Sequence, residues 1–130
     1  MPRAVVEEFL AAVGHGPEQI AVRLASDVVY RAADLPVLNG RLAVQRLWGR
    51  LFRSYGAVTV TPSLLVADDE VVLVRQRQTF GRAGEAFELA GVAVYVVRDG
   101  LVAHWRDCFD RGDLPAPDQA LWSRLWRARW

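Results

Sequence analysis

The chain has 130 residues, 52% of them hydrophobic and 24% charged, which fits one folded domain with a real core and excludes a disordered chain. Its formal net charge of +1 provides no electrostatic basis for binding nucleic acid or an anionic membrane. One cysteine excludes an internal disulfide and a cysteine zinc cluster, and no apolar run reaches the ~18 residues of a membrane span.

The first half of the chain shows helical patterns with one strand among them. Apolar residues recur at helical spacing over residues 2–13, and acidic residues among them argue against a signal peptide, so we expect a cytoplasmic protein. A short second helix is predicted from Pro17 to about Ala25. Residues 27–33 form a predicted strand, DLPVLNG a turn, and residues 40–55 a third helix.

After Gly56 the pattern changes to strands, predicted over residues 57–66, 70–80, 86–97 and 101–109. The first of them contains Pro62, where we expect a bend or a bulge. The segments GRAGE and RDG are typical of hairpin turns. A proline-rich joint, DLPAPD, leads to a last helix in which Trp122, Trp126 and Trp130 form one stripe.

This order predicts an α+β fold for a single domain over residues 1–130, with helices packed on an antiparallel sheet. We expect the sheet to be strongly curved, so that sheet and helices form a cone around one deep, mostly apolar cavity. The tail, residues 118–130, carries too much aromatic surface to remain in solvent. It therefore covers the cavity mouth or packs on the sheet of a second subunit.

Alternation along the strands predicts which side chains face the cavity. Residues 101, 103, 105, 107 and 109 are apolar except for Asp107, so they should face inward, and the opposite face holds Val102, His104, Arg106 and Cys108. In the strand over residues 70–80, one face carries Arg75 and Arg77 and should lie at solvent or at an interface. The other face, with Gln76 and Gln78, should therefore point into the cavity. The polar residues predicted to meet in the cavity are Tyr30, Gln76, Gln78 and Asp107.

The carboxyl of Asp107 is the candidate chemical group. Burial of a carboxylate is costly and raises its pKa toward the range that serves general acid–base catalysis. The alternative is a structural aspartate in a plain hydrogen-bond network. Asp34 and Glu88 stay open as sources of a second acid, although turn chemistry or exposure explains each equally well.

The other reactive side chains point to no further site. His15 and His104 are expected at the surface, and Cys108 is expected to be a packed thiol without a basic partner. We expect Asp110 to bond the backbone at the strand end. No spacing of histidine and acidic residues suggests a metal, so we expect neither a metal nor a cofactor.

Two segments carry a resemblance to a known family. GVAVYVVRDGLVAHWRDCFD resembles the C-terminal hairpin of the limonene-1,2-epoxide hydrolases, in which a strand, a DG turn and a W-R-D-x-F-D run recur. DVVYRAADLPVLNGRLAV resembles the first strand and the following helix start of the same family. The W-R-D-x-F-D run also recurs in SnoaL-like polyketide cyclases and in ring-forming enzymes of polyether pathways. The resemblance covers residues 2–113 and implies the nuclear transport factor 2-like (cystatin-like) cone.

The resemblance also implies roles for single residues. In the hydrolases, the aspartate of W-R-D, a tyrosine and an asparagine hold the water, and an R-x-D pair polarises the epoxide. The aspartate and the tyrosine correspond to Asp107 and Tyr30, but the asparagine corresponds to Ala32. Gln76 and Gln78 stand in place of the R-x-D pair. This departure makes SnoaL-like cyclases the closer resemblance, because a single aspartate carries their acid–base step.

We therefore predict a cofactor-independent acid–base enzyme for a hydrophobic small molecule: a cyclase or isomerase in polyketide, polyether or terpenoid biosynthesis, with an epoxide hydrolase as the alternative. Asp107 would be the general acid/base, assisted by Tyr30, with Gln76 and Gln78 donating to an enolate or alkoxide. The residues predicted to shape the substrate are Trp105, Phe109, Phe80 and Tyr95, the facing of Tyr95 being open.

A non-catalytic ligand-binding or adaptor domain is a further alternative, because one fold can serve both purposes. A titratable acid deep in a closed cavity would favour the enzyme, whereas a flat, filled or absent pocket would favour the adaptor. In either case we expect a homodimer that pairs through the outer sheet face, since the resembling families commonly pair in this way.

Overall fold

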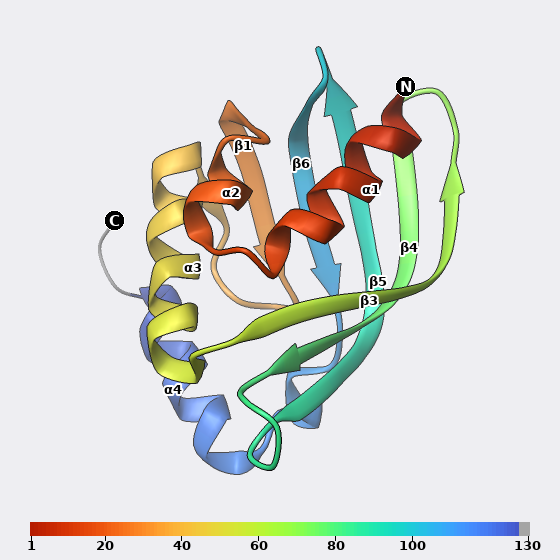
Figure 1. Cartoon of the computed structure of the whole chain (residues 1–130). Helices are drawn as coiled ribbons and strands as arrows, with labels where there is room; N and C mark the ends of the chain where they lie inside the picture. The colour runs from red at the N-terminus through yellow and green to blue at the C-terminus, as the bar shows by residue number, and fades with distance from the viewer. Residues whose placement is uncertain (128–130) are drawn as a thin grey trace.

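The computed structural model describes residues 1–127, so Trp130 of the predicted stripe lies outside the described residues. The chain forms four α-helices, six strands and one short 3₁₀ turn over this range (Figure 1). In chain order these are α1 (Pro2–Val13), α2 (Pro17–Ala21), β1 (Leu24–Ala32), β2 (Leu38–Asn39), α3 (Arg41–Tyr55), β3 (Val58–Ala67), β4 (Val71–Phe80), β5 (Phe87–Arg98), β6 (Leu101–Cys108), η1 (Arg111–Asp113) and α4 (Ala116–Arg127).

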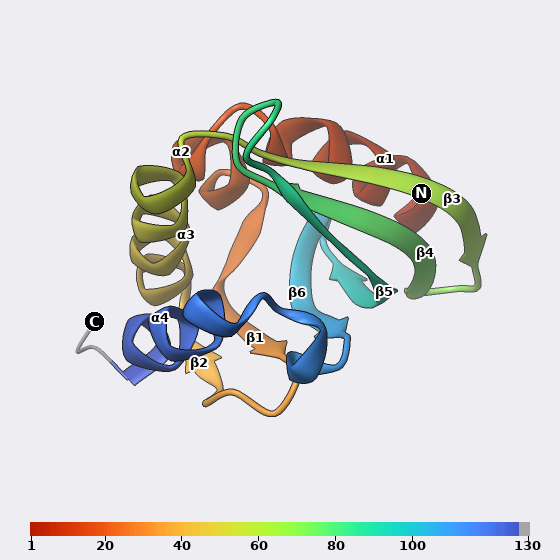
Figure 2. The same ribbon diagram turned by 90° about the horizontal axis from the view of Figure 1, so that it is seen from below.

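The six strands form one curved sheet in the order β2-β1-β6-β5-β4-β3, which is not closed into a barrel. Figure 2 shows how the sheet bends around an interior that α1, α3 and α4 cover. All neighbouring strands are antiparallel except β1 and β6, which run parallel, so the predicted antiparallel sheet is mixed at this pair. No hairpin joins β1 to β6; the long excursion through α3 and β3–β5 leaves their direction free to be parallel.

Several element bounds differ from the sequence-based expectation because tertiary contacts override local pattern. The helix α2 ends at Ala21 and β1 begins at Leu24, where Leu24 is fully buried and pairs with Val102 of β6. Within the predicted turn, Leu38 and Asn39 form a short edge strand against β1. The helix α4 begins at Ala116, ahead of the predicted residue 119, with Pro117 in its first turn.

Two irregularities bend the strands. The predicted bulge at Pro62 is confirmed, since the pairing of β3 with β4 shifts register between Pro62 and Leu64. A second shift, between Val96 and Val97, was not predicted, and it lets both Val102 and Ala103 lie in the interior. The prediction that Val102 faces outward is therefore wrong, because a bulge breaks the alternation of side chains. From His104 onward the predicted alternation holds, with Trp105 and Asp107 inward and Arg106 exposed.

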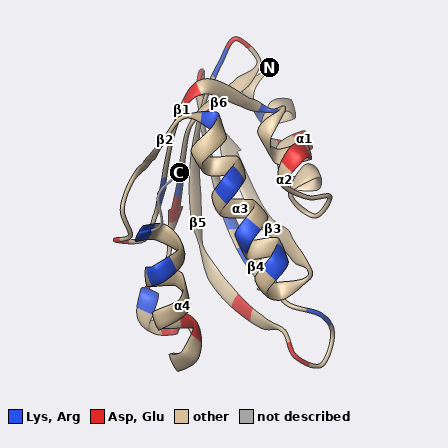
Figure 3. Cartoon of the chain, turned by 90° about the vertical axis from the view of Figure 1, so that its left-hand side faces the viewer, with Lys and Arg blue, Asp and Glu red and all other residues tan. Residues whose placement is uncertain are grey.

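The surface charge is uneven although the net charge is small. The helix α3 carries arginines at positions 41, 46, 50 and 53 and no acidic residue. Figure 3 shows these basic positions along the outer side of α3, with further basic positions on α4. The apolar side of α3 packs inward through Val44, Leu47, Trp48 and Leu51. No helix within residues 1–127 has the length and apolar character needed to cross a membrane.

Gly91 of β5 lies where the backbone of β6 comes very close to it. A Cβ atom at this position would collide with the carbonyl oxygen of Cys108. Gly49 of α3 differs, because a Cβ there would make ordinary contacts, the nearest being Arg53 Nη1 at 3.6 Å. The close approach at Gly91 is to Cys108, the residue that follows Asp107 and ends β6.

We predict opposite effects for alanine at these two glycines. Gly91→Ala should lower the free energy of unfolding by about 1–3 kcal/mol, since the backbones must separate. Gly49→Ala should raise it by about 0.5–1 kcal/mol, because alanine favours a helix interior. Urea unfolding curves of both variants check this, and effects of equal sign would contradict the described packing at Gly91.

Candidate functional site

Asp107 is a buried carboxyl whose oxygens accept hydrogen bonds from three strands. It is 2% exposed. The Tyr30 hydroxyl donates to Oδ2 at 3.0 Å, and the Gln78 side-chain amide donates to the same oxygen at 3.4 Å. The Trp105 indole donates to Oδ1 at 3.0 Å. The carboxyl is thus surrounded by donors, which is the arrangement that a buried charge requires.

The strand pairing explains how these side chains meet. In the parallel pair of β1 and β6, Tyr30 lies beside Trp105, and Ala32 lies beside Asp107. On the other side of β6, Asp107 faces Ala93 of β5. Both neighbours of Asp107 are small, so Gln78 of β4 can reach the carboxyl across β5. Trp105 and Asp107 are two residues apart on one strand face, which places the indole N–H within reach of the carboxyl.

Burial determines the protonation of this group. It raises the pKa of Asp107 from 3.8 to about 6, and the hydrogen bonds from Trp105, Tyr30 and Gln78 oppose that rise. Burial also raises the pKa of Tyr30 well above its usual value, and the neighbouring charge of Asp107 adds to this effect. Tyr30 therefore stays a hydroxyl donor at neutral pH, and Asp107 is the group that changes charge in the physiological range.

Other buried polar atoms near the site have no hydrogen-bond partner. The amide of Gln76, which is 4% exposed, faces Asp107 and lowers its pKa, while its Oε1 accepts no hydrogen bond. The indole nitrogens of Trp48 and Trp126 are likewise buried without a partner among the described residues. Leaving such an atom unpaired costs about 1–3 kcal/mol, so each one calls for an explanation. A bound molecule could pair with them.

The structure brings together the four polar side chains expected to meet, Tyr30, Gln76, Gln78 and Asp107. The four aromatic residues expected to shape a substrate fall into two groups. Trp105 and Tyr95 lie deep and stack at 6.2 Å, which settles the inward facing of Tyr95. Phe80 and Phe109 lie toward the open end of the cone, against Trp122 of α4, at 5.0 and 5.8 Å between ring centroids.

Two further aromatic residues were not anticipated as neighbours of the site. Trp48 of α3 stacks on Trp105 at 5.3 Å, and Trp126 of α4 lies 6.5 Å from the Tyr30 ring. Trp48 could have been found from its place four residues after Val44 and one after Leu47, on the buried side of the helix. For Trp126, the stripe with Trp122 was the signal, but only the structure shows what the stripe covers.

The predicted deep cavity is filled with aromatic side chains. Trp105 is surrounded by the rings of Phe9, Tyr30, Trp48 and Tyr95. The main hollows over the described residues lie elsewhere, and none of them reaches Asp107. The helix α4 lies across the open end of the cone (Figure 2), and its Trp122 and Trp126 are buried there. Of the two positions expected for the tail helix, its described part occupies the mouth of its own chain.

The remaining acidic and nucleophilic candidates lie outside this cluster. Asp34 is exposed and pairs with Arg111 at 2.8 Å, and Glu88 is exposed and lies 3.8 Å from Arg77. His15 and His104 are exposed, and Cys108 is partly buried. The Asp110 carboxylate accepts a hydrogen bond from the backbone of Gly112, as expected at the strand end. Residues 1–127 contain no group of side chains suited to hold a metal ion.

The pKa of Asp107 predicts how stability changes with pH. Between about pH 4 and 6 the folded protein keeps a proton that the unfolded chain releases, so the free energy of unfolding contributed by this group falls as pH rises. The total fall is about 3 kcal/mol. Asp107→Asn should abolish this contribution, so its stability relative to the native protein should rise over this window. Urea unfolding at several pH values tests this; a constant difference would contradict the buried, titrating carboxyl.

Comparison with known proteins agrees with this architecture. A solved LEH-like epoxide hydrolase of M. tuberculosis shares 23% identity and a TM-score of 0.75, over 95% of this chain and 92% of that one. A candidate polyketide cyclase of Xanthomonas campestris shares 20% and 0.74, over 85% and 90%. A protein of ketosteroid isomerase-like fold from Catenulispora acidiphila, solved with trimethylamine, shares 17% and 0.75, over 85% and 88%.

These identities establish a common fold, and no curated protein sequence matches the chain. The model of the SnoaL-like domain family matches residues 6–105 and so spans α1 to the middle of β6. Asp107 follows the matched segment on the same strand. The chain therefore belongs to the SnoaL-like family within the nuclear transport factor 2-like superfamily.

Proposed function

We propose that the protein is a cofactor-independent acid–base enzyme of cyclase or isomerase type that acts on a hydrophobic small molecule. The observation that carries the proposal is the carboxyl of Asp107, buried among hydrogen-bond donors with its pKa raised to about 6. A carboxyl with this pKa can both accept and return a proton near neutral pH. Polyketide, polyether or terpenoid biosynthesis is the proposed setting.

The proposed reaction begins with the Asp107 carboxylate, which removes a proton from carbon next to a substrate carbonyl. The C–H electron pair moves to the carbonyl oxygen, forming an enolate to which the side-chain amides of Gln76 and Gln78 donate hydrogen bonds. In an isomerase, Asp107 returns the proton to another carbon of the substrate. In a cyclase, the enolate carbon attacks a second carbonyl, and Asp107 gives its proton to the resulting alkoxide.

Epoxide opening is the second candidate, supported by the structural similarity to the LEH-like epoxide hydrolase. Its difficulty lies in the residues around the carboxyl. Asp107 is the only acidic side chain in the described cluster, and Gln76 and Gln78 occupy its β4 side. One carboxyl would have to activate water and protonate the epoxide oxygen in the same turnover.

A non-catalytic adaptor is the third candidate, and the filled interior favours it. Two observations weigh against it. A protein that needs only a stable core gains nothing from a buried carboxyl whose ionisation costs about 3 kcal/mol. Three buried polar atoms without partners, on Gln76, Trp48 and Trp126, add to that cost. Both costs are understandable if the interior has to receive another molecule.

We also propose that the protein is a homodimer. The outer sheet face exposes large apolar side chains from three neighbouring strands, namely Leu64, Val66, Val71, Leu73 and Val92. Arg75 and Arg77 lie on the same face. Exposed apolar side chains gathered on one sheet face, with arginines among them, are typical of an interaction surface, and a second copy of the sheet would cover them symmetrically.

The enzyme proposal predicts that Asp107→Asn keeps the fold and lowers turnover about 100-fold or more. The matched control is Glu88→Gln, which neutralises an exposed carboxylate on the neighbouring strand β5 and should leave turnover unchanged. Three reactions form the assay: conjugation of a β,γ-unsaturated ketone, aldol closure of a linear polyketone, and opening of limonene 1,2-epoxide.

We expect turnover in one of the first two reactions and little or no diol from the epoxide. Rapid diol formation that depends on Asp107 would establish the hydrolase instead. If Asp107→Asn retained near-native turnover in the active assay, the assignment of the acid would be wrong. No turnover in any of the three, together with partner binding that survives Asp107→Asn, would support the adaptor.

The dimer proposal predicts a particle of twice the chain mass at micromolar concentration. Leu73→Glu should convert it to a monomer, because a charge at the centre of the apolar patch cannot be buried unpaired. Val22→Glu is the control, since Val22 is exposed outside the sheet. Light scattering distinguishes these outcomes, and a native protein that is monomeric at this concentration would exclude the dimer.

A further inference from the structure

The helix α4 closes the Asp107 site with two side chains. Trp122 and Trp126 are its only buried residues within the described range, and their rings stack at 5.2 Å. Trp122 contacts Phe80 and Phe109, and Trp126 lies against Tyr30. The two indoles therefore cover Phe80 and Phe109, which are predicted to shape the substrate, and the ring of Tyr30, whose hydroxyl donates to Asp107.

The attachment of α4 to the domain consists of side-chain contacts. The Trp122 indole donates to the Tyr55 hydroxyl at 2.7 Å, and that hydroxyl donates to Asp118 at 2.5 Å. Arg111 also donates to Ser123, the next residue of α4, at 3.2 Å. The sheet order contains no part of α4, so no strand pairing holds it. Such a helix can separate from the body without breaking the sheet.

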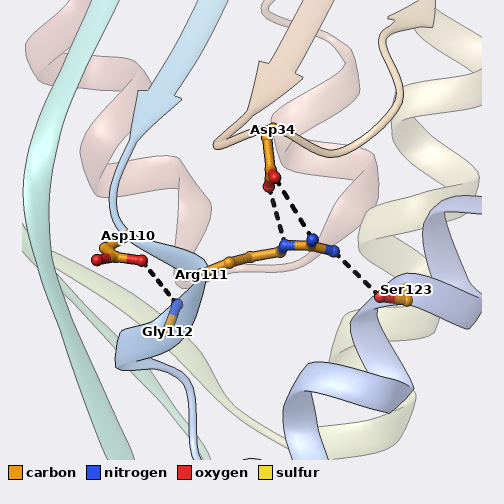
Figure 4. Close-up of polar contacts among 5 residues, drawn as sticks. All are labelled: Asp34, Asp110, Arg111, Gly112 and Ser123. Carbon is orange, nitrogen blue, oxygen red and sulfur yellow. Dashed lines mark hydrogen bonds and ion pairs between the residues drawn. The ribbon is translucent and has the colours of Figure 1, made fainter.

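Arg111 forms a latch between the sheet and α4, shown in Figure 4. Its guanidinium contacts both carboxylate oxygens of Asp34, at 2.8 and 3.4 Å, while its third nitrogen contacts Ser123. Asp34 follows β1 in the chain, so the latch joins the end of β1 to the middle of α4. A planar guanidinium that binds a carboxylate through two nitrogens is more specific than a single surface pair.

The segment that precedes α4 has the features of a hinge. Asp110 fixes the turn η1 through the backbone N–H of Gly112 at 2.8 Å (Figure 4), and Leu114 is buried. Pro115, which follows, is exposed, and so are the first two residues of α4. The chain is thus held up to Leu114, and α4 begins immediately beyond this anchor.

The closed position also leaves Trp126 with an unpaired indole nitrogen. This nitrogen is buried and has no hydrogen-bond partner, which costs about 1–3 kcal/mol in the closed state. The cost would be removed if α4 opened and the nitrogen met water, or if a bound molecule supplied an oxygen acceptor. The free energy needed to open α4 is therefore smaller than the burial of two tryptophans alone would suggest.

We propose that α4 is a lid, that Trp122 and Trp126 form the outer, specificity-determining wall of the Asp107 site, and that the Arg111–Asp34–Ser123 latch holds the lid closed. The molecule admitted is a flat, apolar, oxygen-bearing one, because it would pack against the two stacked indoles and offer an acceptor to the unpaired Trp126 nitrogen. This inference rests on the proposed function for its substrate, but the movement of α4 can be measured without any substrate.

Hydrogen exchange of backbone amides, followed by mass spectrometry on the full chain, tests the lid. In the native protein, amides of residues 118–127 should exchange faster than those of β4 and β5, which open only on global unfolding. Arg111→Met should raise the exchange rate of α4 about fivefold and leave β4 and β5 unchanged, on the scale of a well-formed ion pair. Arg98→Met, which removes the exposed pair with Asp27 at 2.8 Å, should leave α4 unchanged.

The dye 1-anilinonaphthalene-8-sulfonate serves as a flat apolar probe of the opened site. Its fluorescence enhancement should be larger with Arg111→Met than with the native protein or Arg98→Met. If α4 exchanged only together with β4 and β5 in every variant, the lid would be excluded. Faster exchange of α4 without added dye binding would exclude the indoles as the wall of a binding site.

The two proposals fail in different ways in these experiments. Asp107→Asn leaves the latch intact, so α4 should exchange in this variant as in the native protein. Native turnover in Asp107→Asn with a mobile α4 would overturn only the acid–base assignment. Loss of turnover in Asp107→Asn with an α4 as protected as the sheet would overturn only the lid.

Discussion

The hydrogen bond between Tyr30 and Asp107 is the interaction on which most of the interior depends. It joins two residues on parallel strands, and a carboxyl that is almost completely buried needs such donors to be tolerated at all. The need for hydrogen-bond donors around Asp107 also constrains the residues that surround it. Trp105 has to turn its indole nitrogen toward the carboxyl, Gln78 has to reach across β5, and the positions beside Asp107 have to be as small as Ala32 and Ala93.

The aromatic interior reconciles two demands that usually compete. A tightly packed core stabilises a small domain, whereas a catalytic site needs space and polar atoms. Indole and phenol rings satisfy both demands, because their bodies fill volume while their N–H and O–H groups serve the carboxyl. The packing observed around Trp105 is thus a closed arrangement of side chains that also carry the polar atoms of the site.

Sequence reasoning succeeded where the information is local. Alternation along β4 and β6 predicted the inward facing of Gln76, Gln78, Trp105 and Asp107, and Pro62 predicted the bulge in β3. It failed where the outcome depends on distant partners. The early start of β1, the edge strand β2 and the parallel pairing with β6 all follow from which strand lies next to which. The facing of Val102 was predicted wrongly because the bulge in this strand pair is marked by no proline or glycine. The filling of the cavity could not be predicted either, because it depends on how the aromatic rings pack and on where α4 lies.

The parallel pairing of β1 with β6 has a consequence for the order in which the molecule is made. Tyr30 leaves the ribosome 77 residues before Asp107, and β1 cannot enter the main sheet until β6 has been synthesised. Until then, α1 and β1 expose side chains such as Phe9 and Tyr30 whose ring partner, Trp105, does not yet exist. Contacts between residues so distant in sequence form slowly. Until they form, the chain exposes apolar surface that chaperones can bind and that can aggregate. The Tyr30–Asp107 hydrogen bond can therefore form only after β1, β6 and everything between them have been synthesised.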